Sequence, residues 1–124
     1  MLLNNLYTIQ SLSEKDNQIQ TTINLLENHA IFQGHFPGQP VLPGVCMMEM
    51  IAEITGEHLK KSFRISGAPL IKFIRMIDPH INPLILLEIN YSISGDSIIT
   101  NGKIFSGSNT FMKFQINLVP EPVV

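Results

Sequence analysis

The sequence predicts an α+β domain in which one helix packs against an antiparallel sheet. Three observations lead to this fold class. Residues 44–58 are rich in Met, Ile and Ala and contain no proline, which is typical of a helix. The flanking segments alternate apolar with polar residues, or are rich in β-branched residues, as strands are. Short polar turns connect most of these segments, so successive strands should run antiparallel.

The strands are expected on both sides of the helix, two before it and four after it. The turns between them are expected at "SEKDN" in the first half of the chain and at "DPHINP", "GD" and "GSN" in the second half. In the second strand Ile19 and Ile23 alternate with polar residues, so one face of the sheet should meet water. The expected strands are residues 6–12, 18–26, 68–77, 84–94, 97–106 and 110–119.

The helix is apolar around most of its circumference. Only Glu49, Glu53 and Glu57 interrupt the pattern, and their spacing of four places them on one stripe. Such a helix needs cover from the sheet or from a partner chain. A sheet that wraps around it can still leave an edge strand unpaired, which edge-to-edge dimerisation would cover.

Composition limits the classes of function. The 124 residues fit one domain, 1–124, with 44% hydrophobic and 15% charged residues. A net charge of −2 gives no reason to expect nucleic acid or an anionic membrane as partner. No apolar run approaches the roughly 20 residues of a membrane span, and no signal peptide opens the chain. The single cysteine, Cys46, fits a reducing compartment and sits in "VCMM" as a packing residue, so a cytoplasmic protein is expected.

Local charge is less even than the total. Five of the eight basic residues fall between positions 58 and 77, with no Asp or Glu among them. They are either solvated edge and turn positions or a docking surface for a phosphorylated or acidic partner. The five are Lys60, Lys61, Arg64, Lys72 and Arg75.

His35 is the first candidate for chemistry. An imidazole can take up and release a proton near neutral pH. Gly34 and Gly38 allow a sharp turn and a close ligand, and the prolines of "HFPGQPVLPG" stiffen the loop around it. The other histidines, His29, His58 and His80, lack such a setting and receive no role. The alternative for His35 is an ordinary surface histidine.

Glu49 and Gly44 add an acid and a helix start. A carboxylate among methionines is costly to ionise, and Glu53 one turn away would raise the pKa of Glu49 further. A protonated Glu49 beside a neutral imidazole would form a general acid and base pair. Gly44 begins the helix, where free amides could hold a carbonyl oxygen as it gains charge. Together they indicate proton removal next to a carbonyl with loss of a β-hydroxyl, unless the glutamate stripe simply faces water.

The stretch "GHFPGQPVLPGV" followed by "MMEMIAE" closely resembles the signature of the 3-hydroxyacyl-[acyl-carrier-protein] dehydratases of the FabZ/FabA type, which have the hot-dog fold. The shared pattern includes HFPG, a second PG, and an acidic residue fourteen positions after the histidine. Weaker similarity extends over nearly the whole chain, including "IKFIRMIDP". The resemblance implies a sheet of five to six strands wrapped around one central helix.

The resemblance also implies roles for single residues. His35 would be the catalytic histidine and Glu49 the catalytic acid, meeting across a dimer in which each subunit supplies one of the two. The amide of Gly44 would polarise the thioester carbonyl, and the carbonyl of Val41 would orient His35. Phe36 and Glu53 are counted with these as substrate-binding residues. Glu53 stands where the FabZ pattern usually has glutamine.

The implied reaction is dehydration of (3R)-hydroxyacyl thioesters to trans-2-enoyl thioesters, without metal or organic cofactor. The acyl chain would ride on acyl carrier protein in fatty acid, related lipid or polyene biosynthesis. The implied assembly is a homodimer, with room for a higher oligomer. Two alternatives stay open: a hot-dog acyl thioesterase, and a non-catalytic acyl-binding subunit that pairs with an active homologue. For Glu53, the alternatives are a charge that raises the pKa of Glu49, or a residue that faces solvent or a neighbouring subunit.

Overall fold

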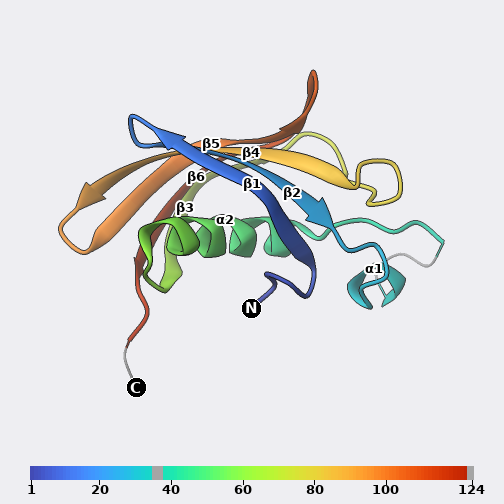
Figure 1. The fold of residues 1–124 in the computed structure, drawn as a ribbon, viewed down its shortest axis with the longest axis horizontal. Helices are drawn as coiled ribbons and strands as arrows, with labels where there is room; N and C mark the ends of the chain where they lie inside the picture. Colours follow the sequence, from blue (N-terminus) through green and yellow to red (C-terminus); the bar gives the residue numbers. More distant parts are fainter. Residues whose placement is uncertain (35–37, 123–124) are drawn as a thin grey trace.

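The computed structural model describes residues 1–34 and 38–122, which contain six strands and two helices. All six strands form one sheet in the order β1-β2-β4-β5-β6-β3, and each neighbouring pair is antiparallel. Figure 1 shows this sheet as a curved layer with the long helix α2 along its inner side. The strands are β1 Tyr7–Lys15, β2 Gln18–Leu25, β3 Phe63–Phe73, β4 Leu84–Ser94, β5 Ser97–Ser106 and β6 Asn109–Pro120.

The core lies between α2 (Gly44–Leu59) and the facing side of the sheet. Met47, Met50, Ile51 and Ile54 are buried, and their spacing of three and four places them on one side of the helix. Alternate residues of the central strands meet them, because successive side chains of a strand point to opposite faces. These buried strand residues include Ile19, Ile23, Ile85, Leu87, Ile89, Ile104, Phe114, Ile116 and Leu118.

The described residues leave the opposite side of α2 uncovered. Val45 is 73% exposed, Glu49 is exposed and Met48 is half-buried. The expectation that sheet or partner must wrap the helix is therefore met by the sheet on one side only. A short helix, α1 (Ile31–Gly34), lies beyond the N-terminal start of α2 in Figure 1 and precedes the loop that leads to that start.

The fold class is confirmed, and four expected strands are placed to within about two residues. The expected strand at 68–77 is wrong in its bounds and its neighbour. β3 begins at Phe63, directly after the helix, and ends at Phe73. It pairs with β6 rather than with the next strand, because the ten-residue connection to β4 carries the chain to the other side of the sheet. Register shifts on both sides of Gly67 obscure the alternation from which a strand is recognised.

The first hairpin is tighter than its sequence indicates. "SEKDN" predicts a five-residue turn, whereas β1 continues through Lys15 and pairs there with Gln18. The turn consists of Asp16 and Asn17, which both have positive φ, at 53° and 62°. Two-residue hairpin turns need this left-handed conformation, and Asp and Asn tolerate it better than most residues.

The two edges of the sheet differ in character. The edge strand β1 contains a bulge between Ile9 and Ser11, and it ends in the exposed polar run Ser13–Lys15, which includes a glutamate. The edge strand β3 instead exposes Leu70 at 50% and Phe73 at 55%, with Met76 just beyond it at 73%. Neither helix in the described ranges is both long enough and apolar enough to span a membrane.

Candidate functional site

The loop that carries His35 and Phe36 is described only at its two ends. Residues 35–37 lie outside the described residues, so both predicted roles stay predictions. On one side the chain ends helix α1 at Gly34, and on the other it resumes at Gly38. Gly38 has φ +82°, a conformation that favours glycine, as expected for a sharp turn.

Gly44 is the first residue of α2. Pro43 precedes it with extended backbone angles and no side-chain hydrogen bond caps the helix start. The carbonyl of Pro43 accepts the amides of Cys46 and Met47, at 3.0 Å and 3.2 Å. The amides of the first helical turn have no earlier helical carbonyl to bond, so the amide of Gly44 is available to an external oxygen.

An apolar groove of about 530 Å³ runs past this helix start. It is lined by residues 41–45 and Met47 on one side and by residues 73–76 on the other. The ring of Phe73 approaches Gly44 so closely that a Cβ added at Gly44 would lie 2.5 Å from Cζ of the ring. The groove therefore depends on glycine at this position, and it brings the predicted residues Val41 and Gly44 together.

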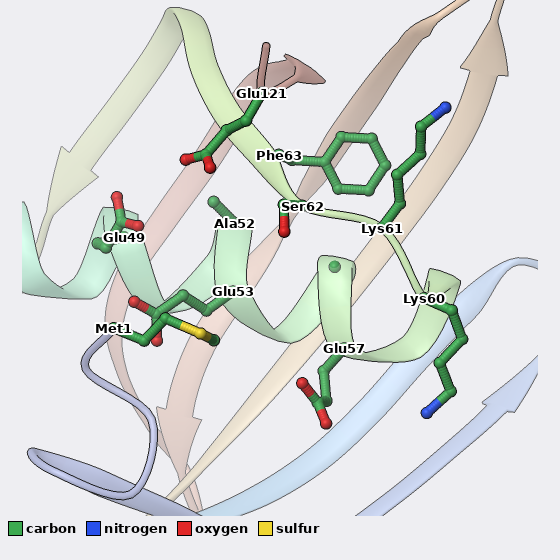
Figure 2. A pocket seen from close by; sticks show the side chains of 11 residues that line it. Met1, Glu49, Ala52, Glu53, Glu57, Lys60, Lys61, Ser62, Phe63 and Glu121 are labelled. Atoms are coloured by element: carbon green, nitrogen blue, oxygen red, sulfur yellow. The ribbon is translucent and has the colours of Figure 1, made fainter. Parts of the chain in front are cut away.

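Glu49 lies on a different surface. It lines an acidic pocket of about 350 Å³, defined here by the carboxylates Glu49, Glu53, Glu57 and Glu121 together with Met1 and the lysines at the end of α2. In Figure 2, Met1 lies beside Glu53, and the carboxylate of Glu121 points toward Glu49. The predicted residues thus divide into two groups, with Val41 and Gly44 in one and Glu49 and Glu53 in the other.

Helix geometry explains the division. Glu49 follows Gly44 by five residues, which corresponds to a rotation of about 140° around the helix axis. Gly44 and Glu49 of the same chain therefore lie on different sides of the helix, and they line different pockets. Val45, one turn before Glu49, shares the uncovered side with it.

The acidity of Glu49 is lowered, as its sequence context predicts. Its pKa is raised, first because partial burial by the surrounding chain disfavours the charged form, and then because Glu53 and Glu121 add negative charge. The ammonium group of Met1 acts in the opposite direction. The carboxyl group is nevertheless exposed in the single chain, because the methionines around it in sequence point elsewhere.

Glu53 is neither solvent-facing nor open to a substrate in the groove. Its side chain is 8% exposed, and its carboxylate accepts three hydrogen bonds from the N-terminal segment. The amides of Leu2 and Leu3 each donate at 2.9 Å, and the hydroxyl of Tyr7 donates at 3.1 Å. Sequence reasoning missed Tyr7, because nothing in the pattern "NNLYTIQ" indicates a contact with residue 53.

The five basic residues of the sequence cluster are all exposed. Lys60 and Lys61 line the acidic pocket, Arg64 and Lys72 belong to the edge strand β3, and Arg75 lines the apolar groove. Arg75 is the one that lies beside the predicted residue Gly44. No group of three His, Cys, Asp or Glu side chains in the described ranges is arranged to hold a metal ion.

The comparison with known families decides the relationship. The family described as ApeI-like, "ApeI dehydratase", matches residues 11–108. The chain belongs to this family. The matched residues include the signature from His35 to Glu53 but not Leu2, Leu3 and Tyr7. The family of the chain is thus a dehydratase family, and its similarity to FabZ enzymes agrees with the resemblance of the signature.

Curated relatives match this ApeI-like chain over shorter stretches. A FabZ 3-hydroxyacyl-[acyl-carrier-protein] dehydratase of Mannheimia succiniciproducens is 42% identical over 55 residues, covering 44% of this chain and 37% of the relative. The FabZ of Oenococcus oeni is 40% identical over 63 residues, 45% of each chain. The chain thus spans less than half the length of each of these two relatives.

Solved structures share the fold over nearly the full chain. A structure titled as the dehydratase heterocomplex ApeI:P from Xenorhabdus doucetiae superposes with a TM-score of 0.70 at 21% identity, covering 90% of this chain and 96% of that one. A hypothetical thioesterase with coenzyme A from Streptococcus pneumoniae reaches 0.64 at 11% identity, covering 93% and 85%. At these identities the similarity shows the hot-dog fold alone.

Proposed function

We propose that the protein removes water from (3R)-hydroxyacyl thioesters carried by acyl carrier protein and yields trans-2-enoyl thioesters. The observation that carries the proposal is the division of the predicted site residues between two surfaces of α2. Such a division is what a site shared by two chains requires, with the apolar groove of one protomer facing Glu49 of its partner. Family membership and the FabZ-like signature support the reaction class.

In the proposed reaction, the apolar groove holds the acyl thioester and the amide of Gly44 donates to the thioester oxygen. His35, oriented by the carbonyl of Val41, removes a proton from the carbon next to the carbonyl. The carboxyl group of Glu49 from the other protomer donates its proton to the hydroxyl at the next carbon. The carbon–oxygen bond breaks, water leaves and a trans double bond remains. The raised pKa of Glu49 supports this role, because the group must carry a proton near neutral pH.

The homodimer of this proposal would form along the edge strand β3. Among the described strands, β3 has a neighbour on one side only, and exposed apolar side chains lie along it and beyond it. The uncovered side of α2, with Val45 and Glu49, would then meet the partner. We place the acyl carrier protein at the opening of the groove near Arg75, and the activity in the cytoplasm in fatty acid, related lipid or polyene synthesis.

Single substitutions test the roles, and mixing them tests the sharing. His35→Ala and Glu49→Gln should each abolish hydration of a crotonyl thioester while circular dichroism stays unchanged. Co-expression of the two inactive chains should restore roughly a quarter of the parent activity, because half of the dimers are mixed and each mixed dimer has one intact site. Glu57→Gln, on the same stripe, is the control and should retain full activity.

Two results would reject the proposal. Near-normal turnover in either single variant would remove that residue from the mechanism, and no recovery on co-expression would remove the shared site. Release of free thiol without loss of water would indicate a thioesterase instead. Tight binding of acyl thioester without turnover would indicate an acyl-binding subunit.

Incubation with carrier-bound 3-hydroxyacyl chains of graded length, followed by mass spectrometry, would define the substrate.

A further inference from the structure

The carboxylate of Glu53 has a hydrogen-bonding pattern that only an acceptor can satisfy. Oε2 accepts the amide of Leu2, and Oε1 accepts both the amide of Leu3 and the hydroxyl of Tyr7. Tyr7 is fully buried and Glu53 nearly so, which makes unpaired polar groups there costly. An amide side chain offers one acceptor oxygen and one donor NH2 group. Glutamine would therefore set its NH2 group against at least one of the two backbone amides.

The segment that Glu53 holds is compact and closed on itself. The amides of Asn5 and Leu6 donate to the carbonyl of Leu2, at 3.0 Å and 2.7 Å, and the amide of Asn4 donates to the carbonyl of Tyr7 at 2.7 Å. Glu53 is 46 to 51 residues away from its three donors in sequence, so this carboxylate joins the N-terminal turn to the middle of α2. Leu6 completes the attachment, because it is fully buried in the core.

The attached segment forms part of the acidic pocket in which Glu49 lies. Met1 lines the pocket next to Glu53, although its side chain is 79% exposed (Figure 2). Glu49 lies one helical turn before Glu53 on the same stripe. Met1 and Glu49 thus line the same pocket, and the hydrogen bonds of Glu53 hold Leu2 and Leu3, which follow Met1 in the chain.

We propose that Glu53 is a positioning residue for the acid Glu49: its carboxylate clamps residues 2–7 across α2, fixes the pocket wall beside Glu49 and keeps a negative charge one turn away. The inference rests on the proposed function for its catalytic meaning, but its structural part does not depend on activity. Two effects disfavour the charged form of Glu49, and the ammonium group of Met1, which the clamped segment also carries, opposes them with a smaller effect than that of Glu53. The clamped wall limits hydration, and the charge of Glu53 disfavours a second negative charge.

The other charged groups near Glu49 come from three elements. Glu121, after β6, raises the pKa of Glu49 as Glu53 does, and the ammonium group of Met1 lowers it. Glu57 and the two lysines at the end of α2 line the far part of the same pocket. Among the carboxylates of the pocket, Glu53 is the one that holds the N-terminal segment by hydrogen bonds.

The test compares Glu53→Gln with Glu57→Gln, which removes the same charge from the same stripe of the helix. In Glu53→Gln the ¹⁵N order parameters of Leu2 and Leu3 should fall from about 0.85 to below about 0.6, the range of flexible backbone. The carboxyl titration of Glu49, followed by ¹³C NMR, should move to lower pH. Both readouts should stay at parent values in Glu57→Gln, and only Glu53→Gln should shift the acid limb of the pH–rate profile.

Equal order parameters and an equal Glu49 titration in the two variants would overturn the proposal. Tyr7→Phe keeps the charge of Glu53 and removes one of its three hydrogen-bond donors, so this variant replaces Glu53→Gln in the test if Glu53→Gln does not fold. It should lower the order parameters of Leu2 and Leu3, and unchanged values there would equally overturn the clamp. Because the NMR readouts need no substrate, a protein without dehydratase activity would refute the proposed function and still answer whether Glu53 positions Glu49.

Discussion

Replacement of Gly44 by alanine should separate activity from stability. An added Cβ would lie 2.5 Å from Cζ and 2.7 Å from Cε1 of Phe73, about 0.9 Å inside the 3.4 Å at which ordinary contact begins. The backbone amide at position 44 remains, so the proposed donor to the thioester oxygen is kept. The ring of Phe73 is half exposed and can move, but it moves along the groove that would hold the thioester.

The expected cost is much larger for catalysis than for folding. A displacement of about 1 Å in a positioned site lowers the rate on the order of 10²-fold, so kcat/KM for a crotonyl thioester should fall by that factor. The free energy of unfolding should change by less than about 1 kcal/mol, because alanine favours the helix while the overlap with a mobile ring opposes it. Urea unfolding and initial-rate kinetics on the same preparation measure both.

Gly67→Ala is the matched control, since the nearest atom to its added Cβ is Nδ2 of Asn117 at 3.9 Å. A double-mutant cycle with Phe73→Ala then assigns the cause. If the overlap is responsible, the loss in the double variant is smaller than the sum of the single losses by about 1 kcal/mol or more. Strict additivity, or a Gly44→Ala enzyme as active as Gly67→Ala, would refute the reasoning.

Three further substitutions test the fold and the electrostatics. Gly102→Ala should lower the free energy of unfolding in urea by about 3 kcal/mol, because its Cβ would lie 1.8 Å from the carbonyl oxygen of Glu88 across the β4–β5 pair; a loss no larger than that of Gly67→Ala would contradict this. Lys60→Gly should raise the stability by about 0.5–1 kcal/mol in thermal unfolding, because Lys60 ends α2 with φ 57°. Glu49→Gln removes a group whose pKa is raised in the folded state, and such a group costs stability as pH rises through its folded pKa. The gain in urea midpoint over the parent should therefore be greater at about pH 7.5 than at about pH 4, and a gain independent of pH would contradict the raised pKa.

The sequence predicts an element best where its apolar residues follow a single helical or strand spacing throughout. The helix from Gly44 was predicted to within one residue of its end, and β4 and β5 have the predicted bounds, because Gly95 and Gly107 mark their turns. β3 was misplaced because Gly67 and Pro69 interrupt its alternation, and only pairing with the distant β6 makes it a strand. Gly56 lies inside the helix, where the carbonyl of Lys61 leaves no space for a Cβ.

For the candidate site, the sequence predicts the direction of the pKa shift of Glu49 better than it predicts where the site residues lie in the fold. The pKa of Glu49 is raised first by partial burial and then by the charges of Glu53 and Glu121, and the spacing of four along the helix reveals the contribution of Glu53. Spacing along the helix does not reveal the exposure of Glu49 or the hydrogen bonds that Glu53 accepts. Both depend on where the sheet and the N-terminal segment pack against the helix. Contacts between residues 7 and 53 carry no local pattern. The roles of His35 and Phe36 remain predictions, because both residues lie in the part of the signature loop outside the described residues.

The contrast between the two edges of the sheet bears on how copies of this chain can associate. A protein whose two sheet edges could both pair with further copies would add copies at each edge and grow into an open fibril. Here the bulge and the charged end of β1 discourage further pairing, whereas β3 has apolar side chains beside its free backbone groups. If copies of this chain associate through β3, as proposed, the same edge is used twice, so the assembly closes after two copies and its two outer edges are both β1.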